Sequence, residues 1–535
     1  MSLQKLPEGI QTFAEIREEG YLYVDKTEHL VNMIDSGKVY FLVRPRRFGK
    51  SLTCSTFEAL FQGKKELFKG LYAEEFLNRP NFKPSPVIRL DMSAVATHKG
   101  LEEVEKSISD IIKLASENLN IEFRDNLSFS SILTNLIKET HDKYGEKVVL
   151  LIDEYDKPFT DFFDKPDMAD EVRRILRGFY SQIKTSDQYL KFIFITGITK
   201  TTKMGVFSTL NNITDISFDK KYGKVCGLTK GELERYFIPH LEEVAKEMQI
   251  SLENLMMKIK EYYDGFCFDG EHYLYNPFSL LSFLRMKKFL NYWIATGTTN
   301  FLFNYLKKRN LTVEQFRGIP VVEDSLFNPS TEIEVAPPSN FLYQSGYLSL
   351  RKNKEDGSLY LDYPNTEVLN SMSLLLAQNL LSVKSGDEDY HRINLITALK
   401  RKNIPDLIAS LNRLLAGIPH NDFDEAAKQN IKYNDYKMTP HEWLYRSSLL
   451  AFLRGAGVVV SGEVQTNRGR ADLVIAVNQN YYVIELKVLS KSTAKQALQQ
   501  IIDKGYAKPY PNAILLGLAI DDEKRQITEV ESSQI

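Results

Sequence analysis

The feature that most constrains the fold is a set of short, almost uninterrupted apolar runs, which alternate with helical patterns over residues 1–220. Strands buried on both faces of a parallel sheet need such continuous apolar sequence, whereas strands with one wet face alternate apolar and polar residues. The predicted strands are residues 39–44, 87–91, 147–152 and 191–196. Their alternation with helices predicts an α/β domain built on a parallel sheet.

The first predicted strand leads into a candidate phosphate-binding loop (P-loop), and a helical pattern follows it. The loop reads Arg44, Pro45, Arg46, Arg47, Phe48, Gly49, Lys50, Ser51. In a P-loop the lysine reaches the β- and γ-phosphates, the serine hydroxyl coordinates Mg²⁺, and the helix N-terminus offers backbone N–H groups. We therefore expect residues 46–51 to bind ATP, with Ser51 also a metal ligand. The alternative is a surface turn with solvated arginines.

One residue departs from the usual loop, because Arg44 occupies the position of the first motif glycine. Glycine there permits backbone angles that other residues resist. We therefore expect a different loop geometry, and we expect the arginines to add positive charge to the phosphate pocket.

The third apolar run ends in two acids, Asp153 and Glu154. Parallel strands deliver their carboxyl ends to the sheet edge where ligands bind. Asp153 is expected to hold Mg²⁺ through water, and Glu154 to polarise the attacking water. Thr196 and Thr199, at the end of the last strand, are candidate sensors of the γ-phosphate, with a cap or turn role as the alternative. The extra strand at 87–91 favours additional-strand ATPases, which include the AAA+ class, over kinases and GTPases.

The middle of the chain changes character twice. Residues 229–310 have a helical pattern, and residues 341–365 read as two strands joined by a charged turn, which resembles a winged-helix arrangement. Helical patterns resume over 366–417, and a polar candidate linker follows at 417–437.

The C-terminal residues return to a strand-rich pattern. The predicted elements are a helix at 440–455, strands at 457–464, 470–477 and 480–487, a helix at 493–505 and a strand at 513–520.

Two of these C-terminal strands carry a pattern typical of metal-dependent nucleases. Asp472 opens one strand, and Glu485 and Lys487 end the next, two residues apart and therefore on one face. Two carboxylates can hold Mg²⁺ or Mn²⁺, and a lysine can stabilise the developing phosphorane charge. This D…E-x-K pattern predicts a restriction-endonuclease-like α/β domain with these three catalytic residues. The alternative is a satisfied ion pair on a sheet edge.

Further side chains are candidates around this triad. Glu442, on the preceding helix, is an expected metal ligand, with a helix-cap role as the alternative. Glu463 is a second candidate carboxylate, and Gln500 is favoured over Gln496 as a group that faces the substrate backbone. The basic residues that could contact phosphates are Arg468, Arg470, Lys491, Lys495, Lys504 and Lys508.

Seven stretches resemble a bacterial family of AAA-ATPase-like proteins. They are YLYVDKTEHL, FLVRPRRFGKSL, LLIDEYDKP, FITGITK, YYDGFCF, YNPFSLL and LYQSGYLSL. In that family a PD-(D/E)XK nuclease-like domain follows at the C-terminus, and the loop motif tolerates arginine at the position of Arg44. The resemblance covers nearly the whole chain. It implies a P-loop AAA-ATPase-like domain at 1–225, a helical lid and winged-helix-like region at 226–435, and a nuclease-like domain at 436–535.

Composition limits the compartment and the partners. The formal net charge is −2, so positive charge for nucleic acid must be gathered locally. The three cysteines lack C-x-x-C spacing, which favours neither a zinc site nor disulfides and fits a reducing compartment. The N-terminus lacks a signal-peptide pattern, and no apolar run approaches membrane-span length. We therefore expect a cytoplasmic protein with no membrane partner.

Together these features predict an ATP-binding, ATP-hydrolysing protein with a nuclease domain that acts on nucleic acid, DNA being favoured. The expected cofactors are ATP and Mg²⁺ or Mn²⁺. One alternative is a nucleotide-switched nucleic-acid-binding or signalling protein with a silent nuclease fold, and another is a nuclease that acts alone beside a relic P-loop. A homo-oligomer stays open because AAA+ relatives often form rings, although the sequence offers no arginine finger to name.

Overall fold

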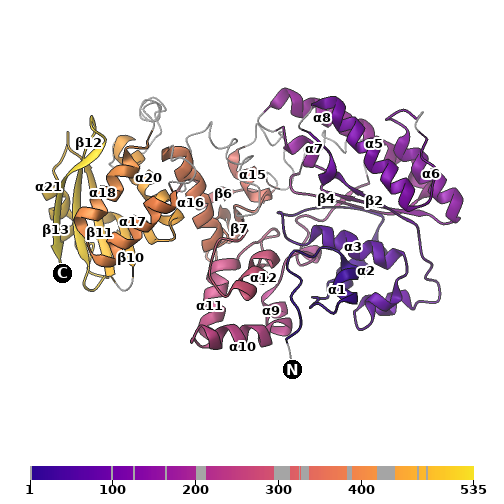
Figure 1. The fold of residues 1–535 in the computed structure, drawn as a ribbon, viewed down its shortest axis with the longest axis horizontal. Helices are drawn as coiled ribbons and strands as arrows, with labels where there is room; N and C mark the ends of the chain where they lie inside the picture. Colours follow the sequence, from indigo (N-terminus) through magenta and orange to yellow (C-terminus); the bar gives the residue numbers. More distant parts are fainter. Residues whose placement is uncertain are drawn as a thin grey trace. The chain divides into compact units, whose positions relative to one another are not determined.

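The computed structural model forms two compact units, Met1–Thr296 with Gly318–Glu367 and Gly297–Arg317 with Val368–Ile535. Each unit has its own five-stranded sheet (Figure 1). The structure describes all residues except 1–2, 98–99, 125–126, 163–164, 201–211, 294–313, 324–325, 327–336, 382–387, 419–439, 467–468 and 478–479. The predicted linker at 417–437 thus lies almost entirely outside the described residues.

The large sheet of the first unit is parallel throughout, with strand order β2-β3-β4-β1-β5. Its strands are β1 (Val39–Val43), β2 (Val87–Asp91), β3 (Val148–Asp153), β4 (Leu190–Gly197) and β5 (Thr214–Asp215). Every residue of β1 and β3 is buried, as the continuous apolar runs predicted. In space β4 lies between the P-loop strand β1 and the acidic strand β3, while β2 lies beyond β3. The strand that lies between the P-loop strand and the acidic strand, as in additional-strand ATPases, is therefore β4. The strand β2 lies between β1 and β3 only in the amino-acid sequence.

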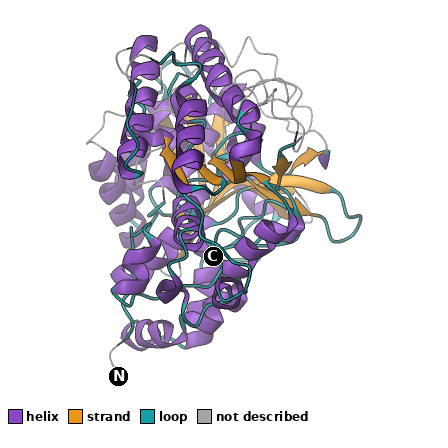
Figure 2. Ribbon diagram, turned by 90° about the vertical axis from the view of Figure 1, so that its right-hand side faces the viewer, coloured by secondary structure: helices purple, strands orange, loops and turns teal. Residues whose placement is uncertain are grey.

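Helices cover both faces of this sheet, as Figures 1 and 2 show. The helices on one face are α1 (Phe13–Glu18), α2 (Thr27–Ser36) and α3 (Lys50–Phe61), with α4 (Ala73–Leu77) packed against α2. Those on the other face are α5 (Leu101–Asn118), α6 (Ile132–Tyr144), α7 (Lys157–Thr160) and α8 (Pro166–Thr185). Helices on both faces explain why the strands need apolar residues on both sides.

Four helices follow the large sheet and form their own apolar cluster. They are α9 (Lys230–Tyr236), α10 (Ile238–Glu247), α11 (Leu252–Tyr263) and α12 (Pro277–Met286). The core of this cluster contains three aromatic side chains, Phe237, Tyr263 and Phe283, each at most 1% exposed. Leu233 and Leu241 are buried in the same cluster. The helical pattern of residues 229–310 is confirmed up to Met286, and residues 294–313 lie outside the described part.

A small antiparallel sheet completes the first unit, with order β6-β8-β7. Its strands are β6 (Ile319–Val321), β7 (Ser349–Lys352) and β8 (Leu359–Asp362), and α15 (Pro338–Gln344) precedes β7. The prediction of a strand from residue 341 is wrong. Pro338 begins a helix, and residues 341–344 are all buried, without the alternation of a half-exposed strand. The hairpin itself, β7 with β8, is confirmed.

The sheet of the second unit is mixed, with order β13-β12-β11-β10-β9. Only β11 and β12 are parallel, and α21 connects them. The strands are β9 (Val459–Thr466), β10 (Gly469–Val477), β11 (Asn480–Val488), β12 (Ile514–Asp521) and β13 (Gln526–Gln534). The helices are α16 (Thr366–Leu381), α17 (Glu388–Arg401), α18 (Ile404–Leu415), α20 (Pro440–Gly455) and α21 (Ala494–Lys504).

Four strands and both long helices of this C-terminal domain lie where the sequence predicts them. The exception is β13, which the sequence does not reveal because seven of its nine residues are exposed and its sequence is mostly polar. This edge strand is recognised only by its pairing with β12. Within the described residues, no helix combines the length and the apolar character that crossing a membrane requires.

Candidate functional site

The loop after β1 has the geometry of a phosphate-binding turn. Gly49 precedes α3 with a φ of 98°, in the left-handed region that glycine reaches without steric cost. The buried Lys50 ammonium donates to the carbonyl oxygens of Arg44 (2.9 Å) and Pro45 (3.0 Å). The helix is 12 residues long, so the N–H groups and the dipole at its N-terminus favour an anion at the loop.

Arg44 does not contribute to the phosphate pocket. Its side chain is 1% exposed, donates to the carbonyl oxygens of Val43 and Ser217, and stacks on Phe268 at 4.6 Å. Its φ is not among the positive ones, so an arginine meets no left-handed strain where a glycine was expected. The expectation that Arg44 adds charge to the pocket is therefore wrong, because burial turns its guanidinium away into the protein.

The acidic end of β3 lies beside the loop. Asp153 is buried, and its Oδ1 accepts hydrogen bonds from the Thr196 hydroxyl (2.5 Å) and from the backbone N–H of Glu154 (3.1 Å). Glu154 has a φ of 51°, rare for a residue with a side chain. Burial raises the pKa of Glu154, whereas the positive charges of Lys50 and Arg46 oppose that rise. The sheet thus gathers the predicted groups from β1, β3 and β4 at one edge.

Asp156 is an important residue that the motif analysis missed. Its buried carboxylate accepts hydrogen bonds from the backbone N–H groups of Ile198 (3.0 Å) and Thr199 (2.6 Å) and from the Thr199 hydroxyl (2.7 Å). These bonds tie the exit of β3 to the exit of β4. Thr199 therefore has an anchoring role, and Thr196 remains the candidate sensor. The sequence feature that could have revealed Asp156 is that it is a third acid, three residues after Asp153.

A pocket of about 550 Å³ adjoins the loop, a size typical of small-molecule sites. The predicted residues that line it are Arg46, Arg47, Phe48, Gly49, Lys50, Ser51 and Glu154. Asp153 and Thr196 are buried and are not among the lining residues. The lining residues that were not predicted include the N-terminal residues Pro7, Gly9, Ile10 and Gln11, the segment Leu22, Tyr23, Val24 and Lys26, the turn Val225–Leu228, and Pro277, Phe278 and Leu281 at α12.

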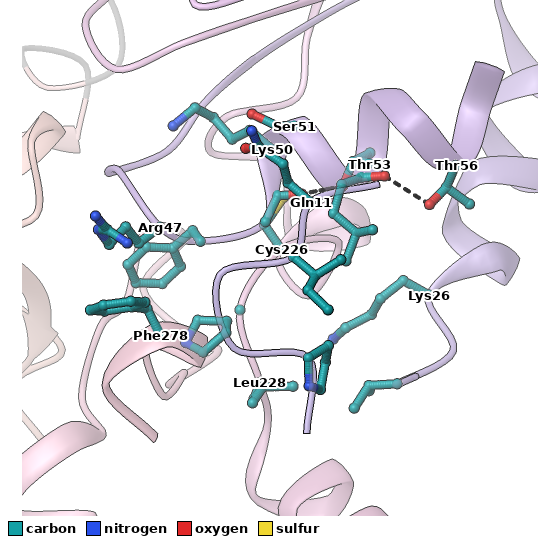
Figure 3. Close-up of a pocket in the computed structure, with 18 of the residues that line it drawn as sticks. Gln11, Lys26, Arg47, Lys50, Ser51, Thr53, Thr56, Cys226, Leu228 and Phe278 are labelled. Carbon is teal, nitrogen blue, oxygen red and sulfur yellow. Dashed lines mark hydrogen bonds between the residues drawn. The ribbon is translucent and has the colours of Figure 1, made fainter. Parts of the chain in front are cut away.

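The rim of this pocket is fixed by an arginine–aromatic contact. The Arg47 guanidinium lies 4.0 Å from the ring centre of Phe278, on the first turn of α12. Figure 3 shows this pair apart from Lys50 and Ser51, which lie together at the start of α3. An arginine stacked on an aromatic ring is held by cation–π attraction. Arg47 thus links the loop to the helices that close the far wall of the pocket.

The outer side of the loop is held by Trp293. Its indole N–H donates to the carbonyl oxygen of Arg46 (3.2 Å), and its backbone N–H donates to the Glu367 carboxylate (2.9 Å). Gly346 packs so closely on Pro45 that a Cβ there would lie 2.5 Å from a proline side-chain atom. These contacts, all within the first unit, leave the loop backbone little freedom.

The Glu367 carboxyl makes stability depend on pH. It is fully buried, one of its oxygens has no hydrogen-bond partner in the described part of the chain, and burial raises its pKa from 4.5 to about 8. A raised pKa in the folded state means that the contribution is complete below pH 4.5 and is lost as pH rises through 8. We expect the wild type to lose about 1.4 kcal/mol of stability per pH unit in this window.

The Glu367→Gln variant is expected to lack this loss, because its side chain stays neutral. The loss of unfolding free energy between pH 5.5 and 8.5 should therefore be smaller for the variant than for the wild type, by the share that Glu367 contributes. The exposed Glu355→Gln is the matched control, with the wild-type slope. Equal pH slopes in the wild type and Glu367→Gln would show that Glu367 does not titrate in this range.

In the second unit, the predicted nuclease residues lie together on two paired strands. Asp472 on β10 is 3% exposed, and its Oδ2 accepts a hydrogen bond from the backbone N–H of Leu486 (2.8 Å). On β11, Glu485 is 2% exposed and its Oε1 accepts from the Lys487 ammonium (2.8 Å). The second Glu485 oxygen, Oε2, is buried without a partner in the described part of the chain. An orphaned carboxylate oxygen beside a second carboxylate fits a hard divalent cation.

Burial makes the two carboxyl groups, Asp472 and Glu485, harder to ionise. It raises the pKa of Asp472 to about 6, against the opposing charge of Lys487. It raises the pKa of Glu485 to about 8, and the neighbouring Asp472 adds to that rise. Two buried carboxyls this close resist full ionisation unless positive charge balances them.

The following helix contributes one glutamine to the cluster. Gln500 on α21 donates from Nε2 to the Glu485 Oε1, whereas Gln496 accepts from the backbone N–H of Thr493 (2.9 Å) in a capping box. The approach of α21 depends on Gly517, where a Cβ would lie 2.2 Å from the carbonyl oxygen of Ala494. Gln500 is thus the glutamine that contacts the Glu485 carboxylate, and its predicted role towards the substrate backbone stays a prediction.

The preceding helix brings two charged groups near the triad. Glu442 and Arg446 on α20 are both buried, and their charges respectively raise and lower the pKa of Asp472. Arg446 was not predicted, although its i, i+4 spacing from Glu442 places both on one helix face. In the part of the chain that is described, no group of three or more His, Cys, Asp or Glu side chains is arranged to hold a metal ion. A metal role for Glu442 stays a prediction.

Several predicted residues surround this site at the surface. The exposed basic ones are Arg470, Lys491, Lys495, Lys504 and Lys508. Arg468 and the side chain of Glu463 lie outside the described residues. That these exposed lysines contact phosphates stays a prediction.

Comparison with known proteins finds one family at the N-terminal part of the chain and another at the C-terminal part. A family model described as "Predicted AAA-ATPase" matches residues 7–207, and one described as "PD-(D/E)XK nuclease superfamily" matches residues 440–530. An uncharacterised protein encoded in the vnfD 5' region of Azotobacter chroococcum mcd 1 is 33% identical over 516 residues, which cover 95% of this chain and 94% of that protein. The chain therefore belongs to the family of predicted AAA-ATPases that carry a C-terminal PD-(D/E)XK nuclease superfamily domain.

Two solved structures show a weaker likeness. The ORC2 protein of Aeropyrum pernix has 11% sequence identity and a TM-score of 0.25, over 66% of this chain and 93% of that one. Cdc6p of Pyrobaculum aerophilum has 10% identity and a TM-score of 0.24, over 66% of this chain and 92% of that one. Both TM-scores are too low to support a conclusion about this chain.

Proposed function

We propose that the chain binds and hydrolyses ATP at the P-loop of the first unit and cleaves nucleic acid phosphodiesters at the metal-dependent site of the second. The observation that carries the proposal is that each site gathers complementary groups from separate segments. Lys50 meets Glu154 across one pocket, and Asp472 meets Glu485 and Lys487 on paired strands.

In the first unit, each group has a distinct task. The N–H groups at the start of α3 and the Lys50 ammonium hold the phosphates of ATP, and Ser51 and Asp153 hold Mg²⁺. Glu154, which lines the pocket, accepts the proton of the attacking water. Thr196, hydrogen bonded to Asp153, reports the state of the γ-phosphate through that bond.

In the second unit, Asp472 and Glu485 hold Mg²⁺ or Mn²⁺. The bound cation supplies Lewis acidity and a water that ionises near neutral pH. Lys487 stabilises the negative charge that develops on the phosphate, and Gln500 fixes the Glu485 carboxylate. The exposed Lys495 and Lys504 of α21 hold the flanking backbone of the substrate.

A cleavage assay tests this function. Plasmid DNA and single-stranded RNA are incubated with the full chain and Mg²⁺ or Mn²⁺, with and without ATP. We expect cation-dependent cleavage that Lys487→Ala lowers on the order of 100-fold, the usual cost of removing one group that stabilises an oxyanion. We also propose that ATP at the first site controls cleavage at the second, so the Lys50→Ala variant should keep the nuclease site and lose the response to ATP.

Two results would limit the proposal. Full cleavage by Lys50→Ala that matches the wild type with and without ATP would refute communication between the sites. No cleavage by the wild type under any condition would refute the nuclease. Thermal melts of every variant establish that a lost activity is not lost folding.

A second candidate is a nucleotide-switched nucleic-acid-binding protein with a silent nuclease fold. The observation that favours it is that the Glu485 Oε1 is already satisfied by Lys487 and Gln500, as in a closed structural ion pair. Salt-dependent binding of DNA without cleavage would support this candidate.

A further inference from the structure

The chain leaves the first unit at two places that are tied to the P-loop. It passes between the two units after Thr296, before Gly318 and after Glu367. Trp293 lies just before the first of these crossings, and Glu367 is the last residue before the third. A displacement of Trp293 or Glu367 therefore acts on backbone that leads directly into the second unit.

Trp293 connects the P-loop to both of these exits. Its indole N–H donates to the carbonyl oxygen of Arg46 (3.2 Å), and its backbone N–H donates to the Glu367 carboxylate (2.9 Å). Trp293 is 6% exposed and Glu367 is fully buried, so water competes little for these hydrogen bonds. Two hydrogen bonds through one residue thus join the loop backbone to the end of the first unit.

The packing around Trp293 leaves little room to absorb a displacement. The centre of its ring lies 5.0 Å from that of Tyr347 and 5.8 Å from that of Phe266. At Gly346, a Cβ would lie 2.5 Å from a side-chain atom of Pro45 and 3.3 Å from one of Trp293. Close-packed interiors transmit strain because they contain few voids. A shift of the loop backbone is therefore passed on to Trp293.

Lys50 gives the reason why the loop backbone responds to ATP. Its ammonium donates to the carbonyl oxygens of Arg44 (2.9 Å) and Pro45 (3.0 Å), the two residues that precede Arg46. In a P-loop this ammonium reaches the β- and γ-phosphates. An ammonium has only three N–H donors, so bonds to two phosphates compete with the bonds to these two carbonyl oxygens. Bound ATP thus changes the hydrogen bonding of the backbone next to the carbonyl group that Trp293 holds.

We propose that Trp293 is a relay, which carries the nucleotide state of the P-loop to the two exits from the first unit and so to the second unit. The relay rests on the proposed function, in which ATP at the first site controls the second. ATP draws Lys50 towards its phosphates, the loop backbone shifts, and the hydrogen bonds of Trp293 pass the shift to Glu367. Trp293 takes no part in hydrolysis and is a positioning residue.

Hydrogen exchange tests the relay without requiring cleavage. Exchange of the α16 amides from residue 368 onward, where the chain enters the second unit, is measured with and without AMP-PNP, an ATP analogue that is not hydrolysed. In the wild type we expect AMP-PNP to change this exchange at least about 5-fold, the lower end of coupling between sites. Trp293→Phe keeps an aromatic ring and the backbone N–H but loses the bond to Arg46. It should lose about 5-fold of the effect, the value of one neutral hydrogen bond.

Tyr292→Phe is the matched control for this variant. The Tyr292 hydroxyl donates to the carbonyl oxygen of Lys288 (2.6 Å) and not to the P-loop, so the control loses one hydrogen bond and should keep the wild-type response. Calorimetry should give both variants an affinity for AMP-PNP within about 5-fold of the wild type. All exchange is measured at saturating AMP-PNP, so a lost response is not lost binding.

Fluorescence follows Trp293 directly. The chain has two tryptophans, and the other, Trp443, belongs to the second unit. In Trp443→Phe all tryptophan emission comes from Trp293. AMP-PNP should change this emission, because the carbonyl group that accepts the indole N–H shifts.

Three results would each overturn the relay and leave ATP binding intact. They are unchanged α16 exchange in the wild type with AMP-PNP bound, an equal exchange response in Trp293→Phe, and unchanged Trp293 emission. A wild type that does not bind AMP-PNP would overturn the ATP-binding proposal and the relay with it. If exchange and emission respond as expected but no nucleic acid is cleaved, the relay stands and the nuclease proposal fails.

Discussion

Glu154→Gln is expected to stop ATP hydrolysis while ATP stays bound. The amide has the shape of the carboxyl but cannot accept the proton of the attacking water, and loss of a general base costs on the order of 100- to 10,000-fold in rate. Glu154 lines the pocket, yet it is Lys50 and the start of α3 that are expected to hold the phosphates. Binding and turnover should therefore separate in this variant.

The measurement pairs phosphate release with calorimetry of ATP binding. Glu105→Gln, an exposed change on α5, is the matched control and should behave as the wild type. Glu154 has a φ of 51°. Glutamine and glutamate have similar conformational preferences, so the substitution should not change the cost of this backbone conformation. Hydrolysis at the wild-type rate would exclude Glu154 as the base.

The sequence predicts the large sheet and the residues at its edge because both follow local rules. Apolar runs define buried strands, and a glycine, a lysine and a serine between a strand and a helix define the loop. What it cannot predict is three-dimensional pairing. The position of β4 between β1 and β3 depends on long-range contacts, and the burial of Arg44 depends on Phe268, which is distant in sequence.

The same limit explains the residues that were missed. Asp156 acts through hydrogen bonds to Thr199, which follows β4 and is distant from Asp156 in sequence. The N-terminal wall of the pocket, including Gln11, carries no phosphate motif and is recognised only through proximity. In the second unit the D…E-x-K spacing predicted that Asp472, Glu485 and Lys487 lie together, because residues two apart on a strand share a face. Arg446 was missed since its role comes from a helix that packs across the strands.

The second large effect is expected from Glu485→Gln, which should remove divalent-cation binding from the second unit. The unpartnered Oε2 of Glu485 is the feature that a cation would satisfy, and an amide nitrogen or a neutral oxygen serves it poorly. Groups that only support a ligand already account for about 10- to 100-fold in metal affinity. Loss of the ligand itself should therefore cost at least about 100-fold in Mn²⁺ affinity.

Calorimetry with Mn²⁺ measures this directly, with three companion variants. Gln500→Ala, which removes only the support, should weaken binding less than Glu485→Gln does. Lys487→Ala should keep the cation and lose cleavage, and the exposed Glu523→Gln should match the wild type. In chelator the Glu485→Gln variant should be at least as stable as the wild type, because a buried group that resists ionisation has become neutral. Wild-type Mn²⁺ affinity in Glu485→Gln would mean that the pair with Lys487 is structural and that any cation is held elsewhere.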